Sequence, residues 1–264
     1  MTWTAERKRE AAVQGPLVRG YLREDTRIIE RRGWYQVVTP SSPGYINEIA
    51  FSQVGPEDAE RAIDEAIATY AAHGLRFKWF VGPWTQPEGF GERLRRRGFQ
   101  SFEMRGMGID TAARFALPAG VNVVEIDASN VDRFVEATMS LWSMPADEID
   151  LERRSHAAAF AREPRVAHFF GVEIDGEWVG GAALIMREGY GYLLGAQVVE
   201  RMRGRGIYKA LIQARLAALR ARGFEYAVTY AQETTSAPIL ERLGFETLFR
   251  STCWFLEPSR PDAS

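Results

Sequence analysis

One order of segments occurs twice along the chain, and this repetition limits the folds available to it. A helix-like stretch, a glycine, an apolar strand-like run, a second helix-like stretch and a Gly-Phe pair follow one another in residues 57–99 and again in 207–245. Each copy closes with a similar hexapeptide, L-R-R-R-G-F at 94–99 and L-E-R-L-G-F at 240–245. Chance produces one matching hexapeptide more easily than the whole order, so we expect two related halves.

Both halves alternate between helix and strand signals, a pattern that predicts a mixed sheet flanked by helices. In the first half, Pro56 opens a helix in which apolar residues of the stretch 62–70 recur at helical spacing. In the second half, Asp175-Gly176 predicts the turn of a β-hairpin. We therefore expect an α/β (α+β) fold made of two mixed sheets.

Leu117-Pro118-Ala119-Gly120 is the predicted linker between the halves, because proline and glycine interrupt the helix and strand signals there. The sequence is accordingly divided into a first domain at 1–116 and a second at 117–258. Residues 259–264 form a short polar tail, for which we expect a loose conformation.

Composition argues against several classes of function. The 264 residues include 33 Lys+Arg and 35 Asp+Glu, so the chain lacks the basic excess of a dedicated nucleic-acid binder. Its longest run without a polar side chain, 179–186, is far shorter than the ~20 residues of a membrane-spanning helix, and Met1–Arg9 lacks the apolar stretch of a secretion signal. One cysteine and three scattered histidines predict no metal site. We expect a cytoplasmic protein with no metal, nucleic-acid or membrane partner.

The segment most informative about chemistry is Gln197–Gly223, which passes from a strand-like run through a Gly-rich turn at 203–206 directly into an amphipathic helix. Such a turn presents unpaired N–H groups together with the positive end of the helix dipole. Four cations surround it: Arg201, Arg203, Arg205 and Lys209. Cations at a helix N-terminus oppose the dipole, so their presence favours a bound anion such as pyrophosphate.

Two familiar phosphate-binding patterns do not fit these glycines. The P-loop needs a Gly-Lys-Ser/Thr run that does not follow Gly204, and the dinucleotide fingerprint needs a glycine at the position of Lys209. The pattern Arg-x-x-Gly-x-Gly does fit, at Arg201, Gly204 and Gly206. Together with L-E-R-L-G-F at 240–245, this segment resembles the GNAT superfamily of acyl-CoA-dependent N-acetyltransferases, over residues 120–257.

The resemblance implies acetyl-CoA as cosubstrate and names the residues that would bind it. Backbone amides of the turn would bind the CoA pyrophosphate, and a pair of valines would hold the pantetheine arm where two strands splay apart. The implied residues are Val198, Val199, Arg203, Gly204, Arg205, Gly206, Ile207 and Tyr208. In the first half the turn reads Q-V-G-P-E-D at 53–58, where proline lacks an N–H and two acids would repel pyrophosphate. We therefore expect a tandem protein with a degenerate first half.

The family's reaction is direct attack of an amine on the thioester, which implies an N-acetyltransferase acting on a small-molecule or peptide amine. Many relatives use a strand glutamate as general base and a tyrosine before L-G-F as general acid. Here the strand has no acid, and Leu240 stands at the tyrosine position. We rank Tyr230 and Glu233 first as replacements. Further candidates are Tyr190, Tyr192 and Glu173.

Loss of both customary groups keeps a second class of function open, in which the protein binds acyl-CoA without turning it over, as a sensor or a structural subunit. Transfer from a charged tRNA is a third, which the balanced charge disfavours. The acids of Ser140–Arg154 suit a cationic acceptor amine, although an exposed helix start explains them equally well. Monomer and homodimer both stay open.

Other reactive or charged side chains are given structural roles. We expect Arg215, Arg220 and Arg222 on a solvated helix face and Cys253 in a strand of the core. Trp84 and Trp142 are candidates for lining an acceptor pocket, with a place in the core as the alternative. His156 and His168 are candidate bases, because an unperturbed imidazole titrates near neutrality.

Overall fold

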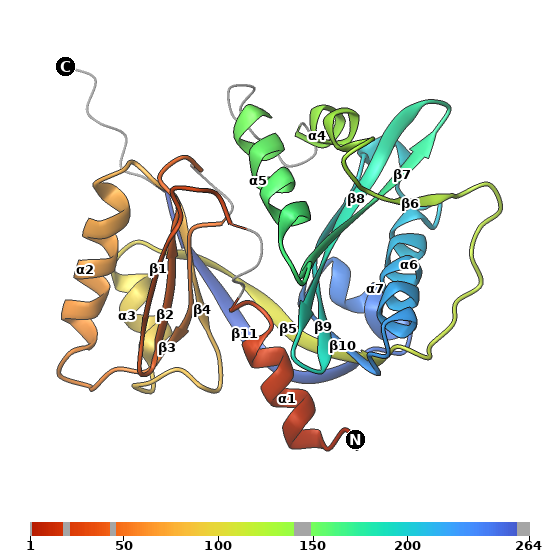
Figure 1. The fold of residues 1–264 in the computed structure, drawn as a ribbon. Helices are drawn as coiled ribbons and strands as arrows, with labels where there is room; N and C mark the ends of the chain where they lie inside the picture. The colour runs from red at the N-terminus through yellow and green to blue at the C-terminus, as the bar shows by residue number, and fades with distance from the viewer. Residues whose placement is uncertain (1, 18–21, 43–45, 140–148, 258–264) are drawn as a thin grey trace. The chain divides into compact units, whose positions relative to one another are not determined.

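The computed structural model describes residues 2–17, 22–42, 46–139 and 149–257. Contacts divide the chain into two compact units. Unit 1 comprises Met1–Arg23, Gly106–Tyr230 and Ile239–Leu248, and unit 2 comprises Glu24–Arg105, Ala231–Pro238 and Phe249–Ser264. Mixed strand pairing with flanking helices confirms the predicted α/β class (Figure 1). The prediction of two sheets is wrong, because the eleven strands of the described residues belong to one hydrogen-bonded sheet.

Unit 2 is built on the strand order β1-β2-β3-β4-β11. The strands are β1 (Arg27–Arg31), β2 (Trp34–Val38), β3 (Glu48–Ser52), β4 (Phe77–Val81) and the later part of β11 (Glu246–Leu256). Among the described residues of these five strands, β3 and β4 are the pair that runs in parallel. Helix α2 (Ala59–Ala71) connects them, and α3 (Phe90–Arg96) follows β4. Two parallel strands need a crossover connection between them. The helix predicted after Pro56 is α2, and it forms this crossover.

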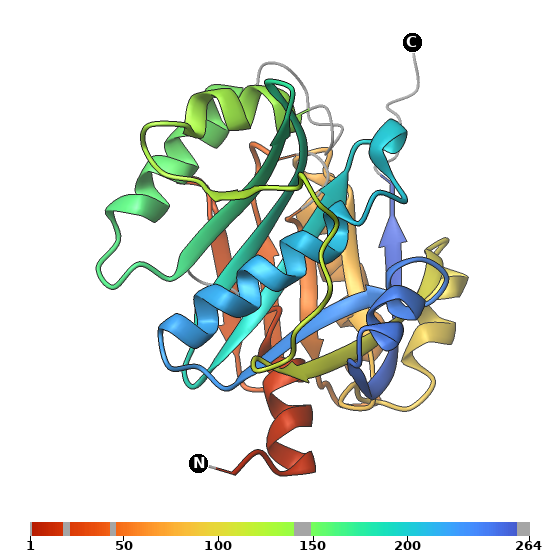
Figure 2. The same ribbon diagram turned by 90° about the vertical axis from the view of Figure 1, so that its right-hand side faces the viewer.

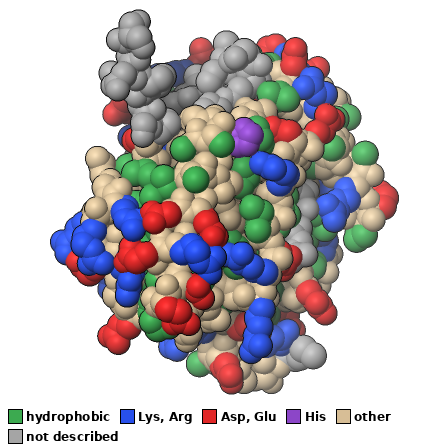
Figure 3. Space-filling view, turned by 90° about the vertical axis from the view of Figure 1, so that its left-hand side faces the viewer, with side chains coloured by type: hydrophobic (Ala, Val, Ile, Leu, Met, Phe, Trp, Pro, Cys, Tyr) green, Lys and Arg blue, Asp and Glu red, His purple; other side chains and the backbone are tan. Residues whose placement is uncertain are grey.

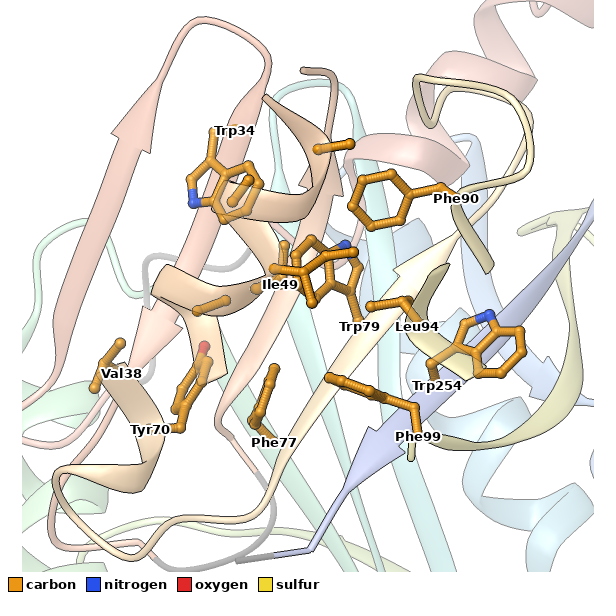
Figure 4. Close-up of a cluster of buried hydrophobic side chains, with 14 of the residues drawn as sticks. Trp34, Val38, Ile49, Tyr70, Phe77, Trp79, Phe90, Leu94, Phe99 and Trp254 are labelled. Carbon is orange, nitrogen blue, oxygen red and sulfur yellow. The ribbon is translucent and has the colours of Figure 1, made fainter. Parts of the chain in front are cut away.

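The core of unit 2 is aromatic and lies between α2, α3 and the strands (Figure 4). The helical spacing predicted for residues 62–70 is confirmed, because Ile63, Ala66 and Tyr70 are buried on one face of α2. Trp79 is fully buried, with Trp34 edge-on at 5.4 Å, and its Nε1 donates to Ser52 Oγ at 3.0 Å. The indole therefore combines a large buried area with a satisfied polar group.

Charged side chains of both signs alternate on the face of the molecule in Figure 3. In unit 2, Glu60 of α2 accepts from Arg93 at 2.7 Å and from Arg97 at 2.9 Å. Such exposed pairs add little stability. Among the residues that the structure describes, no helix is both long enough and apolar enough to cross a membrane.

Unit 1 has the strand order β5-β10-β9-β8-β7-β6, in which β9 and β10 pair in parallel. The strands are β6 (Val123–Glu125), β7 (Ala167–Ile174), β8 (Glu177–Arg187), β9 (Tyr190–Val198), most of β10 (Tyr226–Gln232) and the end of β5 (Gln100–Asp110). The helices are α1 (Ala5–Gln14), α4 (Val131–Met139), α5 (Ile149–Ala161), α6 (Ile207–Ala221) and part of α7 (Ser236–Arg242). Figures 1 and 2 show α6 on one face of β7–β9, with α4 and α5 on the other.

The compact units do not follow the two halves of the sequence. Gly106–Asp110 of β5 belongs to unit 1, although the rest of that strand belongs to unit 2. Conversely, Phe249–Leu256 of β11 belongs to unit 2 and pairs with β4. Each unit is therefore completed by a strand from the other half. The division of the repeat at 116/117 stays a prediction about the sequence, since the contacts group the segments differently.

Helix α1 also joins the later half of the chain, which periodicity does not predict. Trp3 stacks on Tyr226 with ring centroids 4.6 Å apart, and Lys8 pairs with Glu246 at 2.6 Å. The helix buries only Ala11 and Ala12, so its sequence lacks a broad apolar stripe.

Candidate functional site

The Gly-rich turn leads directly from β9 into α6. A short 3-10 segment at Glu200–Met202 follows β9, and Gly206 then caps α6. Gly204 and Gly206 have φ angles of +79° and +76°, a region that glycine adopts without steric cost. A Cβ at Gly206 would lie 2.9 Å from Cγ of Pro118, whereas a Cβ at Gly204 would meet no atom within 4 Å. The backbone at Gly204 is therefore bare and open.

Backbone donors converge on this turn. Within the described ranges of the chain, no backbone carbonyl accepts a hydrogen bond from the N–H of Gly204, Arg205 or Gly206. Ile207 and Tyr208 occupy the first turn of α6, whose N–H groups have no acceptor inside the helix. These five amides have the direction and polarity that an anion requires.

The cations around the turn differ in how far they are already paired. Arg201 forms an ion pair with Glu177 on β8, a partner that the sequence pattern does not reveal. Arg203 lies 3.9 Å from the exposed carboxylate of Glu200, a distance that implies little attraction. Of the residues that the structure describes, none forms an ion pair with Arg205 or Lys209. The turn therefore retains unneutralised positive charge.

A β-bulge interrupts the ladder between β9 and its antiparallel neighbour β8, and the pairing of β9 with its parallel neighbour β10 is short. The register with β8 shifts between Ala182 and Ala183, which oppose Ala196 and Leu194 and leave Gly195 as the extra residue, at a φ of +48°. On the other side, the register of β9 with β10 covers only Gly191 and Tyr192. Past this point the described residues of β9 have no ladder partner in β10, and we call this unpaired side the open edge of β9.

The ladder determines which amides of β9 face that open edge. The N–H of Val199 donates to the carbonyl of Val179 at 2.9 Å, and its carbonyl accepts from Met202 at 2.9 Å. Val199 therefore cannot supply the hydrogen bond predicted for it, because both of its backbone groups are used. In an antiparallel ladder, residues that hydrogen-bond to the partner strand alternate with residues whose backbone groups point the other way. Because Val199 bonds to β8, Val198 and Ala196 direct their N–H groups away from β8. The role predicted for Val198 stays a prediction that this direction allows, and the amide of Ala196 has the same direction.

Sequence reasoning missed Ala196, although a signal for it exists. An isolated glycine inside a strand indicates a bulge, and Gly195 is such a glycine. The bulge shifts the alternation of backbone N–H directions by one residue. The direction of the Ala196 amide therefore cannot be predicted by counting from the start of β9.

Arg215 contradicts the prediction of a solvated face. Its side chain on α6 is 2% exposed. Nη1 donates to the carbonyls of Ala183 at 3.1 Å and Gly195 at 3.3 Å, and Nε donates to Leu211 at 3.1 Å. Burial lowers the pKa of the guanidinium to about 10, so it stays charged at neutral pH. Helical spacing alone misses this because an arginine is rarely assigned to a core position.

The two leading catalytic candidates lie in different surroundings. Tyr230 is half-buried on β10 and directly follows Thr229, whose Oγ1 donates to the carbonyl of Leu193 at 2.8 Å where the pairing of β9 and β10 ends. Glu233 belongs to unit 2, where Arg105 binds its carboxylate at 2.7 and 2.5 Å and Arg250 at 2.6 Å. These arginines lower the pKa of Glu233 to about 2. Such a carboxylate has little affinity for a proton, which argues against the role of general base.

The remaining candidates are engaged or buried. Tyr190 and Tyr192 are buried on β9, where burial raises the pKa of Tyr190. Glu173 pairs with Arg133 at 2.6 Å. Tyr230 is thus the candidate whose position matches the open edge best.

Replacing Glu233 by glutamine is expected to lower stability at pH 7 and to leave it unchanged in strong acid. A carboxylate with a lowered folded-state pKa contributes stability above its unfolded pKa, near 4.5, and loses it as the pH falls toward about 2. The difference in unfolding free energy between wild type and Glu233→Gln should therefore disappear over that window. Chemical unfolding at several pH values tests this. A difference independent of pH would refute the ion-pair role.

The corresponding position of the first half is filled by the chain itself. After β3, the N–H of Val54 donates to the carbonyl of Gln86 at 3.3 Å, and the N–H of Gln86 donates to Ser52 at 3.2 Å. Gln53 and Gln86 form a parallel bridge. The segment after β4 thus occupies the edge of β3 that corresponds to the open edge of β9. This supports the expectation of a degenerate copy.

The surroundings of several other residues singled out in the sequence are now defined. Cys253 is confirmed as a core residue, since it is 1% exposed and burial raises its pKa to about 12. His168 contacts Glu125 at 2.6 Å, and burial lowers the pKa of His156. Trp84 packs edge-on against Phe249 within unit 2.

The acidic segment 140–154, predicted to face an acceptor amine, lies only in part within the described residues. Trp142, Asp147 and Glu148 lie outside the described residues. Asp150, at the start of α5, pairs with Arg153 at 3.0 Å. Among the described residues, no group of three His, Cys, Asp or Glu side chains could hold a metal ion.

Comparison with known proteins gives a family match for part of the chain and similar folds for most of it. Residues 131–245 match the profile described as "Acetyltransferase (GNAT) family". A GCN5-related N-acetyltransferase from Kribbella flavida has a similar structure, with a TM-score of 0.65 at 16% identity, covering 98% of both chains. A tandem GNAT protein from the clavulanic acid biosynthesis pathway matches with a TM-score of 0.55 at 16% identity, over 97% of this chain and 89% of that one.

A functionally unknown conserved protein from Staphylococcus epidermidis is also similar, with a TM-score of 0.63 at 14% identity over 90% of this chain and 96% of that one. No curated protein matches the sequence. At these identities the structural likeness concerns the fold alone.

Proposed function

Residues 131–245 belong to the acetyltransferase (GNAT) family, and from this premise we propose that the protein is an acetyl-CoA-dependent N-acetyltransferase for a primary amine. The observation that carries the proposal is the pair of unused backbone surfaces in unit 1: the bare turn at Gly204 and the open edge of β9 beyond Gly195. Both surfaces are rich in N–H donors, and the residues present fit a ligand with a pyrophosphate and an amide-containing arm.

Each part of the site has one task in this proposal. Amides of Gly204–Tyr208 hold the pyrophosphate, with Arg203, Arg205 and Lys209 adding positive charge. Amides of Ala196 and Val198 hold the arm and polarise the thioester carbonyl. The amine attacks the carbonyl carbon of the acetyl thioester, so that a C–N bond forms, the C–S bond breaks and the CoA thiolate leaves. Tyr230 then protonates the departing thiolate, and water accepts the proton that the amine loses.

The partner class that follows is a small-molecule or peptide amine. We also propose one cosubstrate site per chain, because Gln86 fills the corresponding edge in the first half. A cytoplasmic location fits the proposed cosubstrate, because acetyl-CoA is found in the cytoplasm. For the oligomeric state, a single chain with two halves fits either a monomer or a homodimer.

A non-catalytic role as an acyl-CoA sensor is the second candidate. One observation favours it: Glu233, the carboxylate among the two leading catalytic candidates, is bound by two arginines in unit 2. Under this alternative, binding would be retained and transfer would be absent.

We expect acetyl-CoA to bind with a stoichiometry of one per chain in calorimetry, and to stabilise the fold by about 2.7 kcal/mol at a hundredfold excess over Kd. Release of free thiol from acetyl-CoA in the presence of a panel of primary amines then tests transfer. Binding with no thiol release for any amine would support the sensor. Absence of binding would overturn both candidates.

A further inference from the structure

One buried charge in unit 1 is not used by the proposed reaction. Arg215 is 2% exposed, and no described Asp or Glu side chain forms an ion pair with it. An isolated charge is costly to remove from water unless its donors are satisfied. A buried methionine would fill the same volume without this cost, so the guanidinium calls for a specific explanation.

The acceptors of Arg215 explain its position. A bulge leaves backbone groups without ladder partners, and buried carbonyls need donors. Nη1 reaches the carbonyl of Ala183 on β8 and the carbonyl of Gly195 on β9, one on each side of the register shift. The guanidinium therefore joins the two strands at the point where their own ladder is interrupted.

The second contact also acts on the open edge of β9. The carbonyl of Gly195 and the N–H of Ala196 belong to one peptide group. A hydrogen bond from a cation to that carbonyl polarises the peptide and strengthens its N–H as a donor. The N–H of Ala196 is one of the two amides that face away from β8.

We propose that Arg215 is a positioning residue for the acyl-CoA arm: it holds the Gly195 bulge open and strengthens the Ala196 amide that receives the thioester end of the ligand. The proposal rests on the proposed function, because it requires that acyl-CoA binds along β9. The proposal predicts an effect on binding of the arm and none on binding of the pyrophosphate, because the hydrogen bonds described for Arg215 do not include the turn at Gly204.

The test compares two ligands on Arg215→Met, which keeps the aliphatic volume and removes the charge and donors. Acetyl-CoA uses the turn and the β9 edge, whereas ADP carries a pyrophosphate and no pantetheine arm. We expect the Kd of acetyl-CoA to rise about tenfold, the effect of one lost hydrogen bond to a charged network, while the Kd of ADP changes less than about twofold. Arg222→Met, at the exposed end of the same helix, is the control and should change neither value.

Equal losses for both ligands would mean that Arg215 only supports the fold, and unchanged affinities would show that the bulge does not need it. Either result overturns the proposal. If Arg215→Met does not fold, Arg215→Lys provides the same comparison, because one ammonium keeps the charge but cannot reproduce the planar fork. Failure of the wild-type protein to bind acetyl-CoA would instead refute the proposed function, which distinguishes the two failures.

Discussion

Replacing Gly204 by glutamate is expected to abolish acetyl-CoA binding, with a rise in Kd of about a hundredfold or more. The substitution places a carboxylate among the amides that would hold the pyrophosphate. Two unit charges 4 Å apart repel by about 4 kcal/mol near a protein surface, which alone exceeds a hundredfold. A Cβ at this position would meet no atom within 4 Å, so the fold should persist.

The matched control is Gly98→Glu in unit 2. Gly98 has a φ of +86° and also meets no atom within 4 Å, so both variants adopt the same unfavourable conformation, at about 1–2 kcal/mol. Calorimetry should give the wild-type Kd for Gly98→Glu. Unchanged affinity in Gly204→Glu would show that the cosubstrate does not use this turn, and equal losses in both variants would attribute the effect to destabilisation.

Replacing Trp79 by alanine is expected to lower the free energy of unfolding by about 3–5 kcal/mol, the usual cost of removing a buried aromatic side chain. Trp79 lies at the centre of the aromatic cluster of unit 2, against Trp34 and Phe90 (Figure 4). The variant also leaves Ser52 Oγ without the indole donor, and a cavity of this size does not refill completely.

Urea unfolding of Trp79→Ala measures this loss. Ile29→Ala is the control, because Ile29 is 38% exposed on β1 and should cost less than about 0.5 kcal/mol. The site in unit 1 contains no side chain of the cluster, so the folded variant should retain its acetyl-CoA affinity. A loss below about 1 kcal/mol would mean that the cluster is not a packed core.

The sequence by itself determined the features that depend on neighbouring residues. The turn around Gly204 and Gly206 is local, because only glycine adopts those φ angles cheaply and the helix begins at the next residue. The apolar spacing of α2 likewise identifies its buried face. A local pattern predicts backbone conformation and available donors, and these were enough to predict an anion site and the family that uses it.

Only the tertiary structure decided the features that depend on distant partners. Glu233 lies far in sequence from Arg105, yet their ion pair lowers its pKa and weakens its claim to be a base. The ladder to β8 decides that the N–H of Val199 is used while that of Val198 is available, and the carbonyl of Gly195 is one of the acceptors of the buried Arg215. The ion pair of Glu233 joins residues more than a hundred positions apart, so no short stretch of sequence contains both partners. The direction of the β9 amides depends on a single shift of strand register, which the sequence of one strand does not determine.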